Sequence, residues 1–330
     1  MAATSVLDIC HVNIRSLNED KIDAITAELV SEHDIIMLTE THLPHTHEID
    51  FSLVGFQPLI RKDRIGRPGG GVAMYVANHL GAVRMHEFEV PGLEALWVKI
   101  KAGHNIFYLC VCYRPPNANA DFWTDLQDSI DLVKQSGVNI VLAGDFNADP
   151  KTRDGHLLEL FTVSNSFDKH IHDPTRITST SATILDQFLS SQTILIQDAD
   201  VLDPISTCDH CLIKASVKLK HAYSKPKAFT RHIWQYDLAN FEEFKEQLIL
   251  SDWKACFANG NSVDEATQLW TENFLNVARL CIPNKTITVR PCDKPFFTSE
   301  LRRFRRKKNR LHRKATRTNQ PADWATFRTA

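Results

Sequence analysis

Residues 138–150, with the sequence VNIVLAGDFNADP, combine an apolar run with polar side chains suited to phosphodiester chemistry. The run is short and β-branched, which predicts a buried strand ending at Gly144. Asp145 and Asn147 follow where the backbone leaves the sheet, and both side chains point the same way because they lie two residues apart. The carboxylate can accept a proton and the carboxamide can donate to a phosphoryl oxygen. A simple Asp-Asn turn explains this segment equally well, so the chemistry requires partners elsewhere.

Polar residues also stand at the ends of several other predicted strands. In a packed α/β domain, side chains at like ends of neighbouring strands converge on one crevice. Together with Asp145 and Asn147 they supply four carboxylates, a histidine and two carboxamides, a set that suits Mg²⁺, or alternatively Mn²⁺, better than zinc. These further positions are Asn13, Glu40, Tyr113, Asp186, and Asp209 with His210.

Each of these positions also has an ordinary structural explanation. Asn13 could cap the helix that follows it, and Asp186 could simply begin a turn. Tyr113 could be a core residue with a hydrogen-bonded hydroxyl group. Glu40 could lie on the surface, and His210 could be a packing residue. The functional hypothesis therefore depends on all of them meeting at one place.

The elements expected around these residues alternate between strands and helices, a pattern typical of a layered α/β domain. The glycine-rich segment 61–71 lacks the Gly-Lys-Ser/Thr of a phosphate-binding loop and predicts a hairpin turn, with contact to a nucleic-acid backbone as the alternative. Strands are predicted over residues 5–14, 34–39, 72–76, 95–100, 105–112 and 211–219, and helices over 17–31, 121–135 and 156–163.

The eight cysteines show no spacing typical of a disulfide framework. Cys110 and Cys112 alternate along a predicted strand and are expected on one core face. Cys208 and Cys211 bracket an Asp-His pair like half of a zinc site, but no second half lies nearby, which disfavours zinc. No signal peptide or membrane-spanning apolar run is apparent, so a reducing, intracellular location without a membrane partner is expected.

Charge is distributed unevenly along the chain. The formal net charge is −2, yet ten Lys and Arg without an acid lie between Arg302 and Arg317, so the remaining sequence carries −12. An acidic body with a basic tail indicates metal or phosphate chemistry in one part and polyanion contact in the other. A solvated, partly helical tail without a ligand is the alternative.

Three parts of the chain are predicted from these patterns. Residues 1–220 form the strand-rich domain. Residues 221–298 form a helical region that begins at 229–234 and breaks at 293–297. Residues 299–330 form the basic tail, which stops without a closing element, as a truncated chain would.

Five motifs, in order, resemble the endonuclease/exonuclease/phosphatase superfamily over roughly the first two-thirds of the chain, and several motifs in order are more specific than any single one. They are NIRSL at Asn13, LTET at Glu40, YRPP at Tyr113, GDFNA at Asp145 and DH at Asp209-His210. NIRSL, GRPGGGVAMYV, YRPP and DPTR further resemble the endonuclease domain of LINE-type non-LTR retrotransposons. The segment after Lys220 resembles the linker toward the reverse transcriptase of such elements, which is absent here.

This resemblance implies a four-layered α/β/β/α sandwich of two packed mixed sheets, here with a C-terminal helical extension. It implies that Glu40 is the principal metal ligand, with Asn13 beside it. Asp145 would orient or deprotonate the attacking water, and Asn147 would donate to the scissile phosphate.

The resemblance also implies roles for the remaining candidates. His210 would hydrogen-bond a phosphate oxygen, and Asp209 would be a metal-side or histidine-orienting carboxylate. Asp186 matches the acidic residue of a Ser-x-Leu/Ile-Asp motif. Tyr113 stands where abasic-site and LINE-type enzymes have a tyrosine and where secreted DNases and sphingomyelinases have a histidine, which favours DNA nicking over lipid hydrolysis.

The implied activity is that of a nuclear, Mg²⁺-dependent endonuclease that nicks double-stranded DNA and leaves a 3′-hydroxyl primer. An abasic-site repair endonuclease or a phosphatase of the same superfamily, or a catalytically decayed nucleic-acid-binding protein, are the alternatives. Element RNA is a second candidate partner for the basic tail, and the sequence predicts no oligomeric state. Nucleic-acid contacts are expected from Arg15, Arg64, Arg67, Arg114, Arg302, Arg303, Arg305 and Arg306.

Two residues depart from the pattern of the superfamily. Cys208 replaces the usual serine before Asp-His, which removes a hydroxyl donor and weakens phosphate contact. Thr183 replaces the serine three residues before Asp186, a milder change. Neither departure removes a core catalytic group, so an active enzyme is expected.

Overall fold

The computed structural model describes residues 2–45, 51–119, 121–136, 139–225, 229–257, 262–289 and 298–329. The chain divides into two compact units, one formed by Met1–Pro226 with Cys292–Ala330 and the other by Lys227–Pro291. None of the helices in these ranges has both the length and the apolar composition that a membrane span requires. The break predicted at 293–297 lies outside the described residues.

The first unit contains two six-stranded sheets, and the first sheet is mixed. Its strands are, in spatial order, β13 (Leu195–Leu202), β14 (Leu212–Lys225), β1 (Ala2–Asn13), β2 (Ile35–Thr39), β4 (Val72–Val76) and β3 (Ile60–Lys62). The β1 and β2 strands are parallel and the other neighbours are antiparallel. The hairpin predicted around the glycine-rich segment is confirmed, because β3 and β4 flank this segment as an antiparallel pair.

The second sheet is also mixed. Its strands are, in spatial order, β5 (Gly81–Arg84), β6 (Ala95–Ala102), β7 (Asn105–Tyr113), β8 (Asn139–Asp145), β12 (Asp186–Ser191) and β9 (Phe167–Lys169). The central β7 and β8 strands are parallel. A short hairpin of β10 (Arg176–Ile177) and β11 (Ala182–Thr183) lies outside both sheets.

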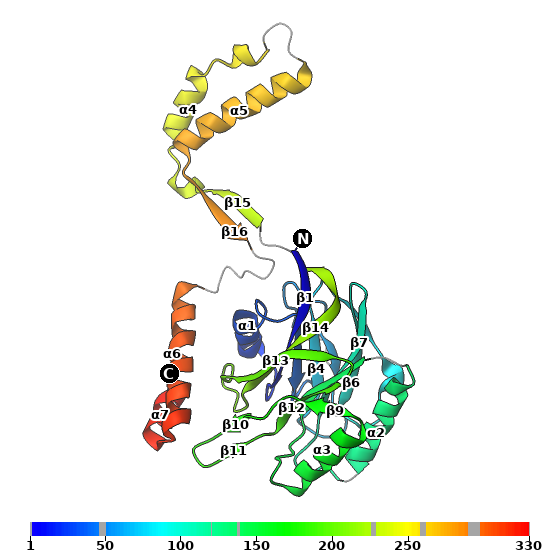
Figure 1. Ribbon diagram of the computed structural model, residues 1–330. Helices are drawn as coiled ribbons and strands as arrows, with labels where there is room; N and C mark the ends of the chain where they lie inside the picture. The colour runs from blue at the N-terminus through cyan, green and yellow to red at the C-terminus, as the bar shows by residue number, and fades with distance from the viewer. Residues whose placement is uncertain are drawn as a thin grey trace. The chain divides into compact units, whose positions relative to one another are not determined.

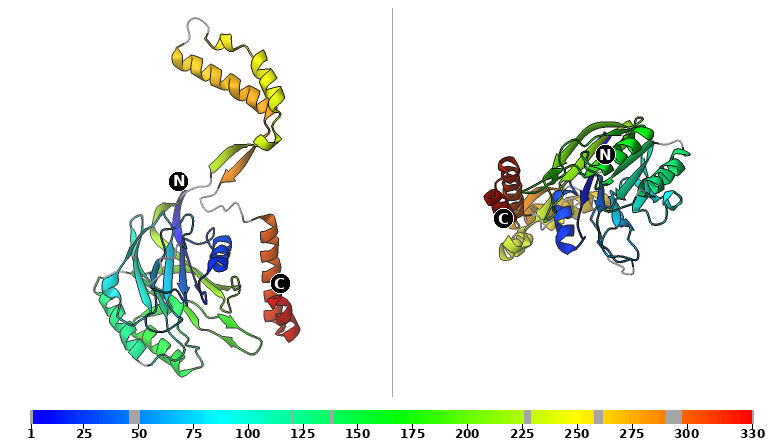
Figure 2. Two further views of the ribbon diagram at one scale, coloured as in Figure 1. Left: turned by 180° about the vertical axis from the view of Figure 1, so that it is seen from behind. Right: turned by 90° about the horizontal axis from the view of Figure 1, so that it is seen from below.

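The sheets pack face to face, with helix α1 (Glu19–Glu28) outside the first sheet and helices α2 (Asp121–Lys134) and α3 (Arg153–Ser164) outside the second (Figures 1 and 2). Alternate residues of β1 divide between two layers: Leu7 and Ile9 enter the core between the sheets, whereas Cys10 and Val12 pack toward α1. Both faces of the central strands are therefore buried, which explains their nearly continuous apolar runs. The four-layered sandwich expected from the sequence is confirmed.

Two local predictions are settled by this core. Cys110 and Cys112 share one fully buried face of β7, as their alternation predicted. The cap of α1 is Asn18, whose side chain accepts from the Lys21 backbone N–H at 3.0 Å, so Asn13 is free for another role. The short turns η1 (His86–Phe88), η2 (Tyr236–Leu238) and η3 (Trp253–Phe257) complete the connections.

The second unit combines a β-hairpin with two helices. The strands are β15 (Phe229–Trp234) and β16 (Asn284–Val289), and the helices are α4 (Phe241–Leu250) and α5 (Val263–Cys281). The prediction that residues 229–234 begin a helical region is wrong, because the segment pairs antiparallel with residues 284–289. Three of its six residues are β-branched or tryptophan, which favours a strand once a partner segment is present.

The basic segment forms helix α6 (Ser299–Thr318), followed by α7 (Pro321–Arg328), and both belong to the first unit. Thr298 caps α6 by accepting from the Leu301 backbone N–H, and Asn319 ends it in the left-handed conformation. In Figure 2, α6 runs beside the blue helix α1. The basic segment is therefore an ordered helix of the sandwich unit.

Candidate active site

Strand register brings the polar strand ends to one edge of the sandwich. In the first sheet, Asn13 pairs with Thr39, the residue before Glu40. In the second sheet, Asp145 lies between Tyr113 of β7 and Asp186 of β12. The sheets stack face to face, so these ends meet across the sandwich.

Gly144 allows the close approach of β8 and β7 just before Asp145. A Cβ atom at this position would collide with the Cys112 carbonyl oxygen. Only glycine fits there, which gives the glycine of the GDFN sequence a packing role in placing Asp145.

Asn13 joins the two carboxylates that face each other across the sheets. Its Nδ2 donates to Glu40 Oε1 at 2.9 Å and to Asp145 Oδ2 at 2.8 Å. The Tyr113 hydroxyl donates to the same Glu40 oxygen at 2.8 Å. Asn13 therefore presents its amide nitrogen to the carboxylates, and its Oδ1 accepts from the Arg15 backbone N–H at 3.1 Å.

Two of the residues that turn into the site have left-handed backbone conformations. Glu40 has φ 52° and Asn147 has φ 45°, an unfavourable region for residues other than glycine. The bend at Asn147 brings its backbone N–H to Asp145 Oδ1 at 2.9 Å. The Asn147 side chain donates one amide hydrogen to the Arg114 carbonyl at 2.8 Å, and its second amide hydrogen can serve another acceptor.

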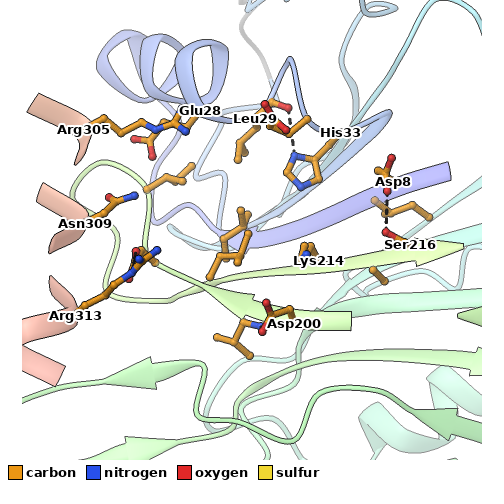
Figure 3. Close-up of a pocket in the computed structure, with 18 residues that line it drawn as sticks. Asp8, Glu28, Leu29, His33, Asp200, Lys214, Ser216, Arg305, Asn309 and Arg313 are labelled. Atoms are coloured by element: carbon orange, nitrogen blue, oxygen red, sulfur yellow. Dashed lines mark hydrogen bonds and ion pairs between the residues drawn. The ribbon is translucent and has the colours of Figure 1, made fainter. Parts of the chain in front are cut away.

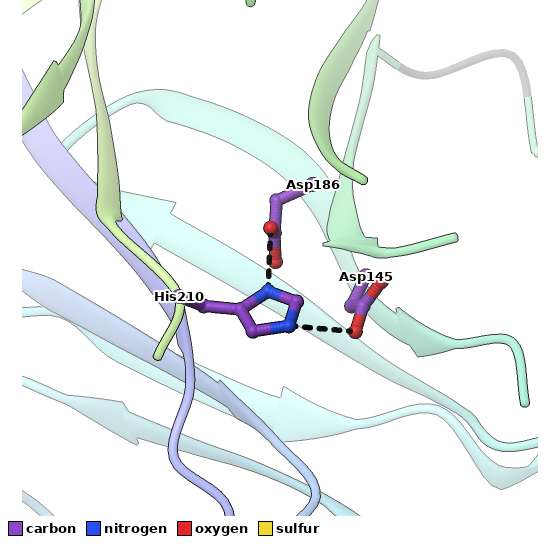
Figure 4. Close-up of side chains that lie close together, drawn as sticks. All are labelled: Asp145, Asp186 and His210. Carbon is purple, nitrogen blue, oxygen red and sulfur yellow. Dashed lines mark hydrogen bonds and ion pairs between the residues drawn. The ribbon is translucent and has the colours of Figure 1, made fainter. Parts of the chain in front are cut away.

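His210 lies between two buried aspartates (Figure 4). Its Nδ1 is 2.8 Å from Asp186 Oδ2, and its Nε2 is 4.0 Å from Asp145 Oδ2. Asp186 is itself held by the Thr175 hydroxyl, which accepts from the Leu185 and Asp186 backbone N–H groups at 3.0 and 3.1 Å. Asp186 thus fixes the orientation of the imidazole and leaves Nε2 directed toward Asp145.

The ionisable groups of the site have strongly displaced pKa values. Burial opposes the positive charge of His210, but Asp186 and then Asp145 outweigh it and raise the pKa of His210 to about 9. Burial and the nearby Asp186 raise the pKa of Asp145 to about 7. Burial disfavours the charge of Glu40, yet hydrogen bonds from Asn13 and Tyr113 lower the pKa of Glu40 below its ordinary value. His210 is therefore a cation beside groups that can accept a proton.

This arrangement fits a divalent metal ion. Asp145, Asp186 and His210 form a buried group whose ligand atoms lie within 4.8 Å of one another, the only such group of His, Cys, Asp and Glu among the described residues. Asp145 and Asp186 are nearly fully buried carboxylates that repel each other, a cost that a nearby cation would reduce. Because His210 Nδ1 is occupied by Asp186, the oxygens of Glu40 and Asp145 are the more accessible hard ligands.

Asp209 is placed differently from the other predicted carboxylates. Its Oδ2 accepts from Arg176 at 2.8 Å and lies 3.6 Å from the Arg15 guanidinium. Asp186, rather than Asp209, holds His210. Arg15 is largely exposed and Arg176 partly so, with 65% and 42% of their side-chain surfaces accessible. Asp209 therefore anchors two cationic side chains at the rim of the site.

The arginines predicted to bind nucleic acid fall into two groups. Arg64 pairs with Glu94 at 2.6 Å and stacks over the Tyr113 ring at 5.5 Å. Arg114 is 2% exposed and pairs with Asp154 at 2.8 Å. Both have internal structural partners, so the structure gives them no free guanidinium for a phosphate. Those that are exposed are Arg15, Arg67, Arg303 and Arg306, with Arg305 half-buried and the Arg302 side chain outside the described residues.

The departures at Cys208 and Thr183 are both at structural positions. Cys208 is buried and its thiol contacts the Ile14 carbonyl at 3.7 Å. The Thr183 hydroxyl donates to the Arg176 carbonyl at 3.5 Å. Neither Cys208 nor Cys211 belongs to a metal-ligating cluster within the described ranges, which removes the support for a zinc site.

The sequence analysis overlooked three residues around the site. His11 is fully buried, with Nδ1 3.7 Å from Asp186 Oδ1, and burial lowers the pKa of His11 to about 4. His42 Nε2 lies 3.2 Å from Glu40 Oε2. Thr175, which supports Asp186, lies in the DPTR motif, so that motif was a usable signal. Nothing local in the sequence distinguishes His11 or His42 from other histidines.

The chain belongs to the endonuclease/exonuclease/phosphatase family, whose model matches residues 10–210. This range contains every residue of the network described above. No curated protein sequence matches the chain. The fold and family define a hydrolytic enzyme of the nuclease and phosphatase class.

Several solved structures share this fold at low sequence identity. The endonuclease domain of TRAS1, a telomere-specific non-LTR retrotransposon, is 13% identical, with a TM-score of 0.54, covering 65% of this chain and 99% of that one. The catalytic domain of Xenopus laevis APE2 is 18% identical, with a TM-score of 0.50, covering 67% and 94%. The catalytic domain of human Nocturnin is 16% identical, with a TM-score of 0.50, covering 65% and 93%.

Proposed function

We propose that this protein is a metal-dependent DNA endonuclease of LINE-type retrotransposon origin, which nicks duplex DNA in the nucleus and leaves a 3′-hydroxyl primer. The observation that carries the proposal is the meeting of Glu40, Asp145 and the His210–Asp186 pair at one edge of the sandwich. The retrotransposon-like NIRSL, YRPP and DPTR motifs and the fold shared with the TRAS1 endonuclease domain support this origin over a repair enzyme. Residues 221–298 would then form part of the linker toward a reverse transcriptase.

In the proposed reaction, a water molecule attacks the phosphorus atom of a phosphodiester. Asp145 orients this water and accepts its proton, for which its raised pKa makes it a competent base. Protonated His210 donates from Nε2 to a phosphate oxygen and stabilises the charge that develops there. Asn147 donates its free amide hydrogen to the same phosphate.

Mg²⁺ is the proposed ion, and Glu40 with Asp145 would hold it. When bound, it would neutralise the phosphate charge. Asn13 and Tyr113 keep Glu40 ionised and correctly oriented, and the pKa of Glu40 lies below its ordinary value for that reason. Hard oxygen ligands of this kind suit Mg²⁺ and Mn²⁺.

The test is nicking of supercoiled plasmid DNA by the purified chain, with Mg²⁺ or with EDTA. We expect Mg²⁺-dependent conversion to open circles whose nicks a DNA polymerase extends, because a 3′-hydroxyl is left. Intact and abasic duplexes should be cut at similar rates. A preference of about 100-fold or more for the abasic duplex would favour a repair enzyme, and metal-independent binding without cleavage would favour a decayed binding protein.

The pH dependence follows from the two displaced pKa values. Activity requires protonated His210, so kcat/KM should fall as the pH rises through about 9. Activity also requires ionised Asp145, so it should fall as the pH drops to about 7 or somewhat below, because a bound cation favours the carboxylate. The measurement is a pH profile of nicking at saturating Mg²⁺. A profile that keeps rising above pH 9 would contradict the role of His210.

A further inference from the structure

Helix α6 is fastened to the sandwich by one face. On that face, Arg305 donates to the Ala27 carbonyl at 3.3 Å and Lys308 lies 3.3 Å from Glu28 of α1. His312 is 5% exposed, and its Nδ1 lies 2.8 Å from Asp203. The inner face of α6 is thus neutralised by carboxylates of the sandwich.

These carboxylates belong to an acidic groove between α1, β13 and α6. Figure 3 shows Arg305, Asn309 and Arg313 of α6 directed into the groove, toward Glu28 and neighbouring residues. Its acidic lining residues are Asp8, Glu28, Glu32, Asp200 and Asp203. The opposite charges on the two walls explain why a strongly basic helix docks on this body.

The loop that α6 contacts is the one that carries the catalytic histidine. Asp203 and Pro204 open the connection between β13 and β14, and His210 stands near its end. Lys308 donates to the Pro204 carbonyl at 2.8 Å, and Arg313 lies 3.1 Å from Asp203. One end of this loop therefore lies under α6 and the other lies in the candidate active site.

The outward face of α6 carries a stripe of basic residues. Residues three and four apart lie on the same side of a helix, and the stripe follows this spacing. With the helical rise of 1.5 Å per residue, it is about 20 Å long. No described residue pairs with the first four of its members, which are Arg303, Arg306, Lys307 and Arg310, followed by Arg313, Lys314 and Arg317, all exposed.

We propose that this outward stripe binds the sugar–phosphate backbone of duplex DNA beside the cleavage site, so that α6 is part of the substrate-binding surface. This inference rests on the proposed nuclease function. A 20 Å stripe corresponds to about six base pairs of one strand. Arg15 and Arg176 at the rim of the site add exposed positive charge near the same catalytic loop.

The composition of the stripe favours duplex DNA over other polyanions. Single-stranded nucleic acids are bound through aromatic platforms, and the stripe contains no aromatic residue. A membrane-surface helix needs an exposed apolar face. The apolar contacts of α6 are turned inward, where His312 packs against Trp324 and Phe327 of α7 with ring centroids 6.0 and 5.1 Å apart.

The test compares two triple variants of the full chain in an Asp145→Asn background, so that binding is measured without cleavage. The stripe variant carries Arg306→Gln, Lys307→Gln and Arg310→Gln. The control carries Lys101→Gln, Lys218→Gln and Lys220→Gln, which removes the same charge from exposed positions on β6 and β14. The probe is an intact fluorescent DNA duplex, titrated over a range of NaCl concentrations.

We expect the stripe variant to bind the duplex about 10- to 100-fold more weakly and to lower the slope of log K against log salt by about 3. The control should keep the wild-type slope. Equal losses in both variants, or no loss in the stripe variant, would overturn the proposal. Stripe-dependent binding of a stem-loop RNA more tightly than the duplex would assign the surface to RNA instead. Stripe-dependent duplex binding by a protein that never nicks would refute the proposed function alone.

Discussion

Replacing Asp145 by asparagine is expected to lower Mg²⁺-dependent nicking by about 100- to 1,000-fold, the range for losing one preorganised catalytic group. Asparagine has nearly the shape of aspartate, and its Oδ1 can still accept from the Asn147 backbone N–H. It can neither accept the proton of the attacking water nor carry the charge that attracts a divalent ion. The loss should therefore be chemical, with the fold retained.

The measurement is the initial rate of plasmid nicking by wild type and Asp145→Asn across a range of Mg²⁺ concentrations. Circular dichroism and thermal unfolding check the fold. Asp168→Asn is the matched control, because it makes the same chemical change at an exposed position on β9. If Asp145→Asn nicks as fast as the control, the assignment of this site is wrong.

Replacing Asp186 by asparagine is expected to lower nicking at pH 8 by about 100-fold or more. Asp186 contributes the largest of the effects that raise the pKa of His210, and without it burial draws that pKa well below 9. At pH 8 the imidazole would then be mostly neutral and a poor stabiliser of phosphate charge. The Thr175 hydroxyl can still accept from the backbone of residues 185 and 186, so the loop should stay in place.

The diagnostic readout is the pH profile of the Asp186→Asn variant. Its alkaline limb should move to lower pH, with part of the activity recovered near pH 6, whereas a structural defect would lower the rate equally at every pH. Asp209→Asn is the matched control, because Asp209 pairs with Arg176 and Arg15 at the rim. We expect it to cost less than about 10-fold. An unshifted profile for Asp186→Asn would exclude control of His210 by this carboxylate.

Much of the fold could be predicted because its central strands are buried on both faces. Segments such as 34–39 and 138–145 are nearly continuous apolar runs, and each ends in a polar residue that has no reason to be buried with them. Residues 229–234 were misassigned because a short apolar segment does not reveal its period. Its strand conformation depends on pairing with residues 284–289, more than fifty positions away.

The sequence by itself determined the kinds of elements and the polar residues at the strand ends, because hydrophobic period and turn chemistry are local properties. Only the tertiary structure decided the partners. Strand register joins Asn13 to Asp145 across 132 positions and gives His210 to Asp186 rather than to its neighbour Asp209. Packing likewise turned Arg64 and Arg114 inward. These outcomes depend on which surfaces meet when the chain collapses, and that is a property of the whole fold rather than of any segment.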